Sequence, residues 1–495
     1  MQNFKFLSAA MCFSLFSVFS WAQTWDGSTK QEPANVENIY QISNGAELAW
    51  FSAQAESAIL SANAVLTADI DLGNHPWTPI GLTKATCYTG VFDGQGHHVK
   101  GLYIEVPNTK SAFWGLFGFL GSSTAQIKNV SVSGAIEVPA GNTVETNVGA
   151  IVGDIDSAAG ITNCHSDATI TVNGKVGYVG GLIGLMKAVE VTHCSYTGKI
   201  EIAATMAGCK GCGGIVGTSN SGTKGISETI KDCFFAGEIV SNLPDGNANL
   251  ASIGGILGYA NLSAGFDNII NCYGYGTITG VVKSDRKDFI IGRTDSGNLD
   301  IQNTYGLSSL DHGYGIAKEA DAFNSGEIAY LLNGDQTLIT FGQDLSSADN
   351  HPVYFNNNRV YRIQFMASDA MFATTYCNST LKLIQDEPTQ DNCKFVGWFD
   401  ADGTAYTADT QISADITLYA RFNNIVVGIN DISEETVHIS VIDGDIAIDA
   451  IQTTQITVYT STGYALKTIV APKGRTIIPM NDKGLFIVNG KKVIL

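Results

Sequence analysis

A short block that recurs six times constrains the fold of this chain more than any other feature of its sequence. Most copies consist of a small residue, two apolar residues and a glycine, and successive copies start 31 to 41 residues apart. The copies are Gly115–Gly118, Ala150–Gly153, Gly181–Gly184, Gly214–Gly217, Gly255–Gly258 and a weaker Phe289–Gly292. The first five end in the motif glycines Gly118, Gly153, Gly184, Gly217 and Gly258. A period of this length indicates a repeat protein in which each unit packs against the next.

A second block follows each copy of the first, and a third block ends most units. The second block starts with a β-branched residue, and its copies are Ile127–Val130, Ile161–Cys164, Val191–Cys194, Ile230–Cys233, Ile269–Cys272 and a weaker Ile301–Thr304. The third block alternates apolar and polar residues, as in Gly198–Ile202. Each unit therefore holds about three short strands and lacks the long 3.6-residue periodicity that helical repeats require.

Short strands need neighbours that satisfy their backbone and cover their inward side chains. The economical solution stacks equivalent strands of successive units about 4.8 Å apart. This predicts an all-β fold with a right-handed β-helix-like solenoid over residues 64–310. The 54 glycines suit a chain of short strands and tight turns. A β-propeller is the alternative, but each of its blades needs four strands and roughly 40–50 residues.

The N-terminus has the pattern of a secretory signal peptide over residues 1–22. Lys5 precedes a short apolar stretch, and small residues occupy the usual cleavage positions, so we expect cleavage after Ala22. The stretch is too short to span a membrane, and no later segment has about 18 consecutive apolar residues. Residues 23–63 follow as a lead-in with a short helix, for which Asn44 is the candidate N-cap. The chain is therefore expected to be secreted or held at the cell surface.

The charge balance argues against nucleic acid as a partner. The chain carries 28 Lys and Arg against 47 Asp and Glu, which gives a formal net charge of −19, and no basic stripe is visible. An acidic surface repels phosphate backbones. Together with the export signal, this composition predicts an acidic extracellular protein.

Four cysteines share the last position of the second block: Cys164, Cys194, Cys233 and Cys272. In a solenoid their side chains would stack in one column, which could be a metal or redox ladder or a buried column of small apolar residues. We favour the buried column, because cysteine packs well in cores and Val130 takes the same position in the first unit. Side chains stacked in register seldom meet disulfide geometry. We therefore predict neither a metal nor a cofactor.

Cys209 and Cys212 form a C-x-x-C motif. A zinc site would require a second pair at suitable spacing and a redox motif would require a βαβ setting, and the sequence offers neither. A local disulfide or two thiols on a surface loop is the preferred interpretation. Removal of Cys12 with the signal peptide leaves nine cysteines, so at least one thiol cannot pair within the chain, and the state of Cys87 stays open.

Two pairs of carboxylates are candidates for a glycosidase or a calcium-dependent lyase: Asp69 with Asp71, and Asp154 with Asp156. β-Helical enzymes that cut polysaccharides offer clustered acids and a basic residue on one long face. Asp154 and Asp156 have no equivalents in later repeats, and the repeat face is poor in arginine.

His97 and His98 beside Asp93 form another candidate cluster, but a turn after Gly94 is the simpler account. We therefore predict no catalytic residues.

The G-L-F-G-like block resembles the GLUG repeat of bacterial surface proteins, and Gly90–Gly96 followed by Gly101 and Leu102 resembles the usual entry to such repeats. The resemblance covers roughly residues 64–310. GLUG repeats occur in adhesin-like proteins and beside some surface proteases, so the resemblance implies a location rather than an activity. Residues 311–360 are expected to form a junction with a short helix over residues 325–334.

Residues 361–424 resemble the Listeria–Bacteroides repeat, similar to internalin B-repeats, through Phe395–Phe399 and Ile416–Phe422. The resemblance implies a small β-grasp-like module, with Trp398 in its core rather than on a binding surface. Cys377 and Cys393 lie in this module and are candidates for a disulfide, because so small a module would benefit from a crosslink.

Residues 425–495 resemble the C-terminal sorting domain of type IX secretion cargo, through Ile456–Tyr459 and Gly484–Ile494. This resemblance implies a small β-sandwich, translocation across the outer membrane and attachment at its surface.

Together these features predict a non-catalytic, adhesin-like surface protein of a Bacteroidota cell, whose solenoid meets a host glycan, a mucin or a matrix protein. A β-helical polysaccharide lyase or hydrolase is the alternative, and a structural surface protein without a soluble ligand is the third interpretation. A groove with clustered carboxylates would favour the enzyme, and a buried cysteine column would favour display.

Overall fold

The computed structural model has two compact units, which we describe separately. The first unit consists of Met1–Ile363, Thr375–Lys382 and Asp409–Ile416, and the second of the remaining residues. The signal-peptide prediction falls outside the residues that the structure describes. These are 24–108, 112–203, 209–220, 227–243, 251–261, 266–280, 284–295, 298–310, 313–333, 340–343, 350–354, 360–377, 386–408, 410–414, 416–424 and 437–495. Within these ranges, no helix is both long and apolar enough to cross a membrane.

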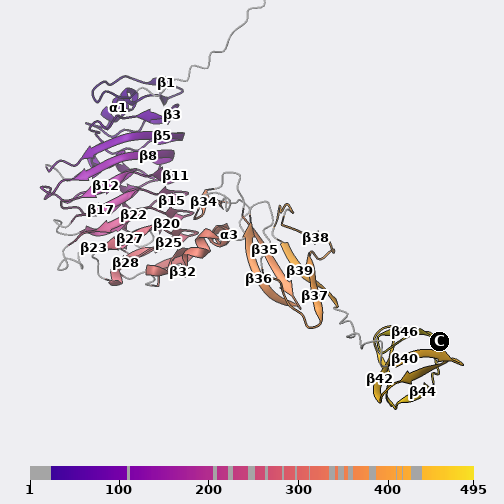
Figure 1. Cartoon of the computed structure of the whole chain (residues 1–495). Helices are drawn as coiled ribbons and strands as arrows, with labels where there is room; N and C mark the ends of the chain where they lie inside the picture. The colour runs from indigo at the N-terminus through magenta and orange to yellow at the C-terminus, as the bar shows by residue number, and fades with distance from the viewer. Residues whose placement is uncertain are drawn as a thin grey trace, which may run out of the picture. The chain divides into compact units, whose positions relative to one another are not determined.

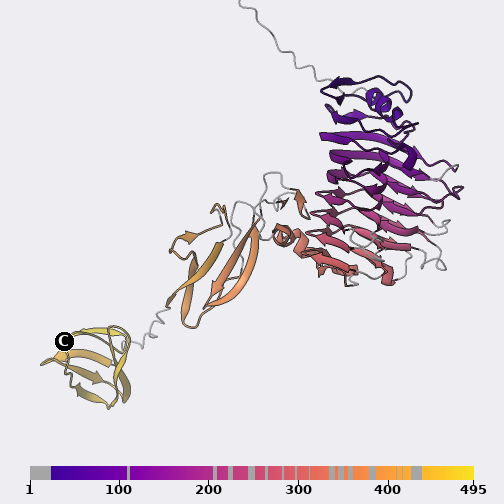
Figure 2. The same cartoon turned by 180° about the vertical axis from the view of Figure 1, so that it is seen from behind.

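Parallel strands of successive units stack into three sheets in the first unit (Figures 1 and 2). The second sheet has six strands, β7 (Phe117–Gly121), β10 (Val152–Ser157), β14 (Ile183–Met186), β19 (Val216–Ser219), β24 (Leu257–Ala260) and β29 (Ile291–Thr294). The third sheet also has six, β6 (Phe113–Trp114), β9 (Asn147–Gly149), β13 (Tyr178–Gly180), β18 (Cys209–Gly213), β23 (Ala251–Gly254) and β28 (Lys287–Asp288). Each motif block spans the corner where the chain passes from the third sheet to the second.

The main sheet has 20 strands and carries the second and third blocks. Its strands are β1 (Ala34–Val36), β2 (Ile39–Ile42), β3 (Asn63–Leu66), β4 (Ile70–Asp71), β5 (Val91–Glu105), β8 (Gln126–Val138), β11 (Gly160–Ser166), β12 (Thr169–Val172), β15 (Glu190–Thr192), β16 (Ser195–Tyr196), β17 (Lys199–Ile202), β20 (Ser227–Lys231), β21 (Phe234–Phe235), β22 (Glu238–Ser241), β25 (Phe266–Ile270), β26 (Tyr273–Gly274), β27 (Thr277–Gly280), β30 (Asn298–Gln302), β31 (Tyr305–Leu307) and β32 (Ile316–Lys318). The predicted all-β solenoid is confirmed by this stacking.

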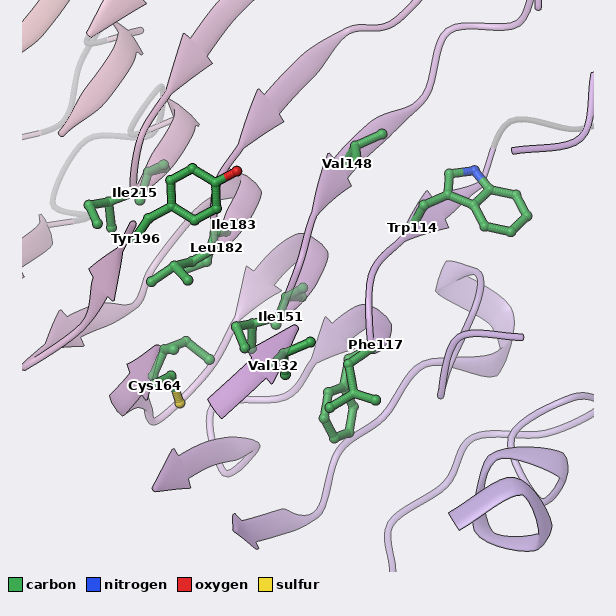
Figure 3. Packing of buried hydrophobic residues seen from close by; sticks show 14 of the residues in the cluster. Trp114, Phe117, Val132, Val148, Ile151, Cys164, Leu182, Ile183, Tyr196 and Ile215 are labelled. Carbon is green, nitrogen blue, oxygen red and sulfur yellow. The ribbon is translucent and has the colours of Figure 1, made fainter. Parts of the chain in front are cut away.

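Equivalent residues of successive coils lie opposite one another. In the second block, Ile161 pairs with Val191, Val191 with Ile230, Ile230 with Ile269, and Ile269 with Ile301. Because the register is kept from coil to coil, the same position always faces the interior. The apolar residues of the blocks therefore form one continuous core, and Figure 3 shows Phe117, Ile151 and Leu182 around the same interior as Cys164 and Tyr196.

A left-handed residue interrupts the main sheet in each coil, at the third position of the second block. The residues are Asn129, Asn163, His193, Asp232, Asn271 and Asn303, with φ between 45° and 55°. Asn, Asp and His adopt this conformation more readily than other non-glycine residues, because a short polar side chain bonds to nearby groups. Because of this turn, the apolar first residue and the small fourth residue of the second block both face inward.

The lead-in holds the predicted helix, α1 (Gly45–Ala53). The side chain of Asn44 accepts a hydrogen bond from the backbone nitrogen of Glu47, as an N-cap does. Leu48 and Phe51 are fully buried and join the solenoid core. The helix therefore covers the first coil.

After the last coil the chain returns across the main sheet. The described parts of residues 313–354, which we call the strap, include α2 (Ala320–Asn324), α3 (Glu327–Asn333), β33 (Phe341–Gly342) and β34 (Val353–Tyr354). Phe323, Phe341 and Leu332 of the strap are buried in one cluster with Phe234 and Tyr273 of the main sheet. The junction expected over residues 311–360 is thus a packed layer in its described residues.

The sheet that follows has the order β36, β35, β39, β37, β38. These strands are β35 (Tyr361–Ala367), β36 (Ala370–Cys377), β37 (Cys393–Phe399), β38 (Ala405–Tyr406) and β39 (Ile416–Asn424). Trp398 is 3% exposed, and its ring lies 4.7 Å from that of Phe365 and 5.4 Å from that of Phe395. Trp398 is therefore a core residue, as expected from the sequence.

Residues 437–495 form two antiparallel sheets around one apolar cluster. One sheet has three strands, β40 (Val437–Ile442), β41 (Asp445–Ala450) and β44 (Gly474–Ile478). The other has four, β42 (Thr454–Thr460), β43 (Ala465–Ala471), β45 (Leu485–Val488) and β46 (Lys491–Ile494). Side chains of both sheets share this core, which is the arrangement of a β-sandwich.

Candidate functional site

One column of side chains on the outer face of the main sheet changes character along the solenoid. Because side chains alternate along a strand, the residue after each inward cysteine, or after the residue at the same position in another coil, belongs to the outer face. The strand pairing places seven such residues opposite one another in the order His98, Ser131, His165, Ser195, Phe234, Tyr273 and Tyr305. We call this set the outer column. Its first four members are polar and its last three are aromatic.

The strap covers the aromatic half of the outer column. Phe234 and Tyr273 stack with their ring centres 5.1 Å apart, and Tyr354 of the strap lies 5.1 Å from Phe234. The hydroxyl of Tyr354 is 2.9 Å from the carbonyl oxygens of both Cys194 and Asp232. Phe234, Tyr273 and Tyr305 are all buried as a result.

The polar half of the outer column is partly exposed at His98, Ser131 and His165, whereas Ser195 is buried. A shallow hollow of about 240 Å³ lies over it, with no lysine or arginine among its lining residues. Its polar lining residues are His98, Ser131, His165, Ser166, Asp167, Ser195 and Thr197. The ring of His165 lies 5.2 Å from the ring of Tyr354, so the strap reaches the outer column at His165.

A directed chain of hydrogen bonds fixes the side chains below the hollow. Nδ1 of His165 is 2.9 Å from Oγ of Ser195, and Nε2 is 3.0 Å from Oδ1 of Asn163. An amide oxygen only accepts, so Nε2 carries the proton and Nδ1 accepts from the Ser195 hydroxyl. Nδ2 of Asn163 then donates to Asn129, whose Nδ2 donates to Asp93. Burial lowers the pKa of His165, which is consistent with this neutral tautomer.

The arrangement of Ser195, His165 and Asn163 has the connectivity of a nucleophile, a base and an orienting group. A carboxylate in the third position stabilises the imidazolium that forms when the base takes a proton. Asn163 is a neutral amide, so it orients the ring without offsetting that charge. Ser195 is also only 6% exposed. The geometry therefore suits recognition of polar groups better than it suits acyl transfer.

The carboxylates singled out in the sequence serve local contacts. Oδ1 of Asp69 accepts from the backbone of His98 and lies 3.2 Å from Nδ1 of His97, which together lower the pKa of Asp69. Asp71 accepts from the backbone of Gly73 and the hydroxyl of Thr24.

Asp154 and Asp156 differ in their surroundings. Asp154 is buried and accepts from Asn147 at 2.7 Å, and burial raises its pKa to about 7. Asp156 is exposed and pairs with Lys187 at 2.9 Å. In the part of the chain that the structure describes, no three His, Cys, Asp or Glu side chains are grouped as metal ligands would be.

A buried pair of carboxyl groups was missed in the sequence. Glu228 and Asp267 lie opposite each other on β20 and β25, and both are at most 1% exposed. Their carboxyls share a hydrogen bond, and Ser219 donates a second one to Asp267. Burial, and then the charge of Asp267, raises the pKa of Glu228 to about 9. The repeat register could have revealed the pair, because Val189 and Leu299 occupy the same inward position in the coils on either side.

The four column cysteines are fully buried free thiols in the core. The sulfur of Cys194 lies 3.4 Å from the backbone nitrogen of Cys164, and that of Cys233 lies 3.4 Å from the nitrogen of Cys194. Thr304 makes the corresponding contact to the nitrogen of Cys272 with its hydroxyl, at 3.3 Å. The column therefore accepts backbone N–H groups at the left-handed turns, in addition to filling the core.

We expect Cys194→Ala to lower the free energy of unfolding by about 2 kcal/mol, because it removes buried volume and leaves the Cys164 N–H without its acceptor. Cys194→Thr should cost less than about 1 kcal/mol, because Thr304 and Val130 show that the column holds both a hydroxyl and a branched side chain. Chemical denaturation under reducing conditions measures both, with the half-exposed Cys393→Ala as the neutral control. Equal losses in the two Cys194 variants would contradict the acceptor role.

The interpretation of Cys209 and Cys212 as a local disulfide or as surface thiols is wrong. Both are free and fully buried on β18 of the third sheet. The strand pairing shifts register between them, so both side chains lie in the core although they are three residues apart. Cys87 is also free and buried.

The predicted disulfide between Cys377 and Cys393 is not formed in this structure. Cys393 is free and its sulfur lies 3.4 Å from Oδ1 of Asn424, while the side chain of Cys377 lies outside the described part of the chain. Strands β35 and β39 separate the two strands in the sheet, which corresponds to roughly 14 Å and exceeds the reach of a disulfide.

Comparison with known proteins gives one family match and two distant likenesses. A stretch of 197 residues, 38% of this chain, is 28% identical to halomucin of Haloquadratum walsbyi, of which the chain spans 2%. The solved structure of a candidate immunoglobulin A1 protease from Bacteroides ovatus has a TM-score of 0.39 and 16% identity, over 66% of this chain and 95% of that one. Residues 361–421 match the Listeria-Bacteroides repeat domain, which confirms that part of the resemblance drawn from the sequence.

Proposed function

We propose that this protein is a non-catalytic, adhesin-like protein of the cell surface, and that the open half of the outer column binds glycan. The observation that carries the proposal is the row of His98, Ser131 and His165, which are partly exposed and held in register on the main sheet below a shallow polar hollow. Sugars present many hydroxyls, and a row of fixed donors and acceptors complements them.

The comparisons support an extracellular or surface location. The Listeria–Bacteroides repeat and the alignment with halomucin both favour it. We further propose that residues 64–310 are a GLUG-type array, that residues 311–360 are its junction, and that residues 425–495 act as a sorting-like domain for the outer membrane. A host glycan or mucin is the preferred partner, and a matrix protein is the other one to test.

The test is a glycan and mucin array probed with the chain from residue 23 onward. We expect saturable binding that falls about tenfold in the double variant His98→Ala/Ser131→Ala, because the loss of one or two hydrogen bonds is worth about 1.4 kcal/mol. Thr277→Ala, an exposed change elsewhere on the main sheet, is the matched control. Binding that survives in the double variant would place the site elsewhere, and the absence of binding to every glycan would refute the proposal.

A second candidate function is hydrolysis, for which the hydrogen-bonded order Ser195–His165–Asn163 is the supporting observation. Reducing ends and released acyl groups are assayed in the same array supernatants. Release that disappears in Ser195→Ala would establish the hydrolase and overturn the non-catalytic proposal.

A further inference from the structure

We infer that the hollow receives the end of a neutral glycan chain rather than an internal stretch of it, and that Tyr354 is the stop. This inference rests on the proposed glycan binding and specifies which part of the glycan is recognised. It follows from the fact that one column of the sheet is partly exposed over three coils and buried over the next four.

The open half of the outer column defines a direction for an extended ligand. Equivalent side chains of successive coils repeat about every 4.8 Å, which is close to the length of one sugar unit in an extended chain. His98, Ser131 and His165 therefore offer one polar side chain per unit over roughly 10 Å. A chain that lies along this row meets the strap directly after His165, because the ring of Tyr354 packs against both His165 and Phe234, and Ser195 between them is buried.

Tyr354 is a fixed wall at that point. Its hydroxyl donates to the carbonyl oxygens of Cys194 and Asp232, which belong to two successive coils. Its ring packs against His165 at 5.2 Å, His193 at 6.3 Å and Phe234 at 5.1 Å. Both the hydroxyl and the ring hold Tyr354 in place, so a ligand cannot continue across the aromatic coils.

At the other end of the hollow, His98 is followed by an exposed side chain and not by a packed ring. Beyond His98 the next contact is Asp69, whose side chain is 61% exposed and bonds to His97 and His98. A chain can therefore leave the hollow toward α1 but not toward the strap. This asymmetry is what distinguishes binding of a chain end from binding of an internal segment.

The charges around the hollow select a neutral chain end. Its charged lining residue, Asp167, is an acid, and Asp69 beside His98 adds a second one. Lysine and arginine are absent from the lining residues, and His165 is neutral through its bonds to Ser195 and Asn163. A terminal sugar that carries a carboxylate or a sulfate would be repelled, whereas a neutral one would not.

The experiment titrates the chain with size-fractionated neutral oligosaccharides, namely mannan, xylan and desialylated mucin glycans of increasing length, by isothermal titration calorimetry. For the glycans that bind, we expect one protein per glycan chain and a Kd per chain that stays constant within twofold beyond about three sugar units, the length of the open row. Sialylated counterparts should bind at least tenfold more weakly.

Two outcomes separate this inference from the proposed function. Several proteins per chain, with a Kd that falls as the chain lengthens, would overturn end recognition and leave glycan binding intact. No binding by any glycan would overturn both. Tyr354→Ala should convert one protein per chain into several, and Tyr354→Phe, which keeps the ring, should retain the stop. Circular dichroism confirms that both variants fold.

Discussion

Replacing Gly217 with alanine is expected to prevent the solenoid from folding at ordinary temperature. A β-carbon at this position would lie 2.5 Å from the carbonyl oxygen of Gly184 and 2.7 Å from the carbonyl carbon and oxygen of Val179. These are backbone atoms of the preceding coil, in the second and third sheets, and both sheets are held in register by their neighbours. No side-chain rotation relieves the clash, so we expect a loss of about 3 kcal/mol or more.

The position of Gly217 makes this a test of the motif rather than of glycine in general. The other motif glycines, Gly118, Gly153, Gly184 and Gly258, would likewise bring a β-carbon within 2.5 Å of backbone atoms of the preceding coil. The block therefore has a glycine here because two sheets approach each other too closely for any side chain.

Gly141→Ala is the matched control, because an added β-carbon there meets nothing within 4 Å and the backbone has no positive φ. Hydrogen exchange of peptides from β13 to β24 reports on the solenoid alone, even though the chain has further domains. We expect protection to collapse in Gly217→Ala and to match the parent in Gly141→Ala. Equal protection in the two variants would show that the coils can separate and would refute the packing argument.

The repeat pattern carried most of the information about the fold. The three blocks, their order and their spacing predicted stacked parallel strands, because a period of two within each strand leaves only one way to bury the apolar positions in every coil. The cysteine column followed from the same register. The role of the cysteine sulfurs as hydrogen-bond acceptors could not be predicted from this register. It depends on the left-handed turn at Asn163 and its equivalents, after which a backbone N–H needs an acceptor.

The candidate site was largely invisible in the sequence. Ser195, His165 and Asn163 lie in two coils, and their contact depends on a register that only strand pairing shows. The strap is a non-repeating segment, so nothing in the repeat pattern predicts where Tyr354 lies. The error at Cys209 and Cys212 has a similar origin, because the C-x-x-C motif was interpreted locally and the third sheet was not foreseen.

The buried pair of Glu228 and Asp267 leads to the second large prediction, which concerns pH. The shared hydrogen bond requires one proton, and Glu228 holds it because burial and the neighbouring charge raise its pKa to about 9 from the ordinary value of 4.5. Lys187 and the backbone N–H of Ala188 favour the ionised form, but they are outweighed by burial. The folded chain therefore keeps a proton that the unfolded chain loses above about pH 4.5.

The sign of the effect follows from this difference in bound protons. Where the folded state binds more protons than the unfolded state, the free energy of unfolding falls as the pH rises. The contribution of Glu228 is complete below pH 4.5 and is lost progressively up to about pH 9. Between pH 4.5 and neutrality this amounts to about 3 kcal/mol. The solenoid should therefore be more stable in mild acid than at alkaline pH.

Glu228→Gln isolates this contribution, because an amide donates to Asp267 and accepts from Ala188 without a proton that titrates. We expect the unfolding midpoint of the parent solenoid to move to lower denaturant concentration between about pH 5 and about pH 8. The midpoint of the variant should move much less, so that at the higher pH the variant is more stable than the parent. Asp154→Asn is the control, because the pKa of Asp154 is raised only to about 7. Removing this carboxyl should therefore change the dependence of stability on pH only below neutrality. If Glu228→Gln instead destabilises the chain equally at both pH values, the pair does not share a proton, and Glu228 must be ionised in the folded core with its charge balanced by Lys187.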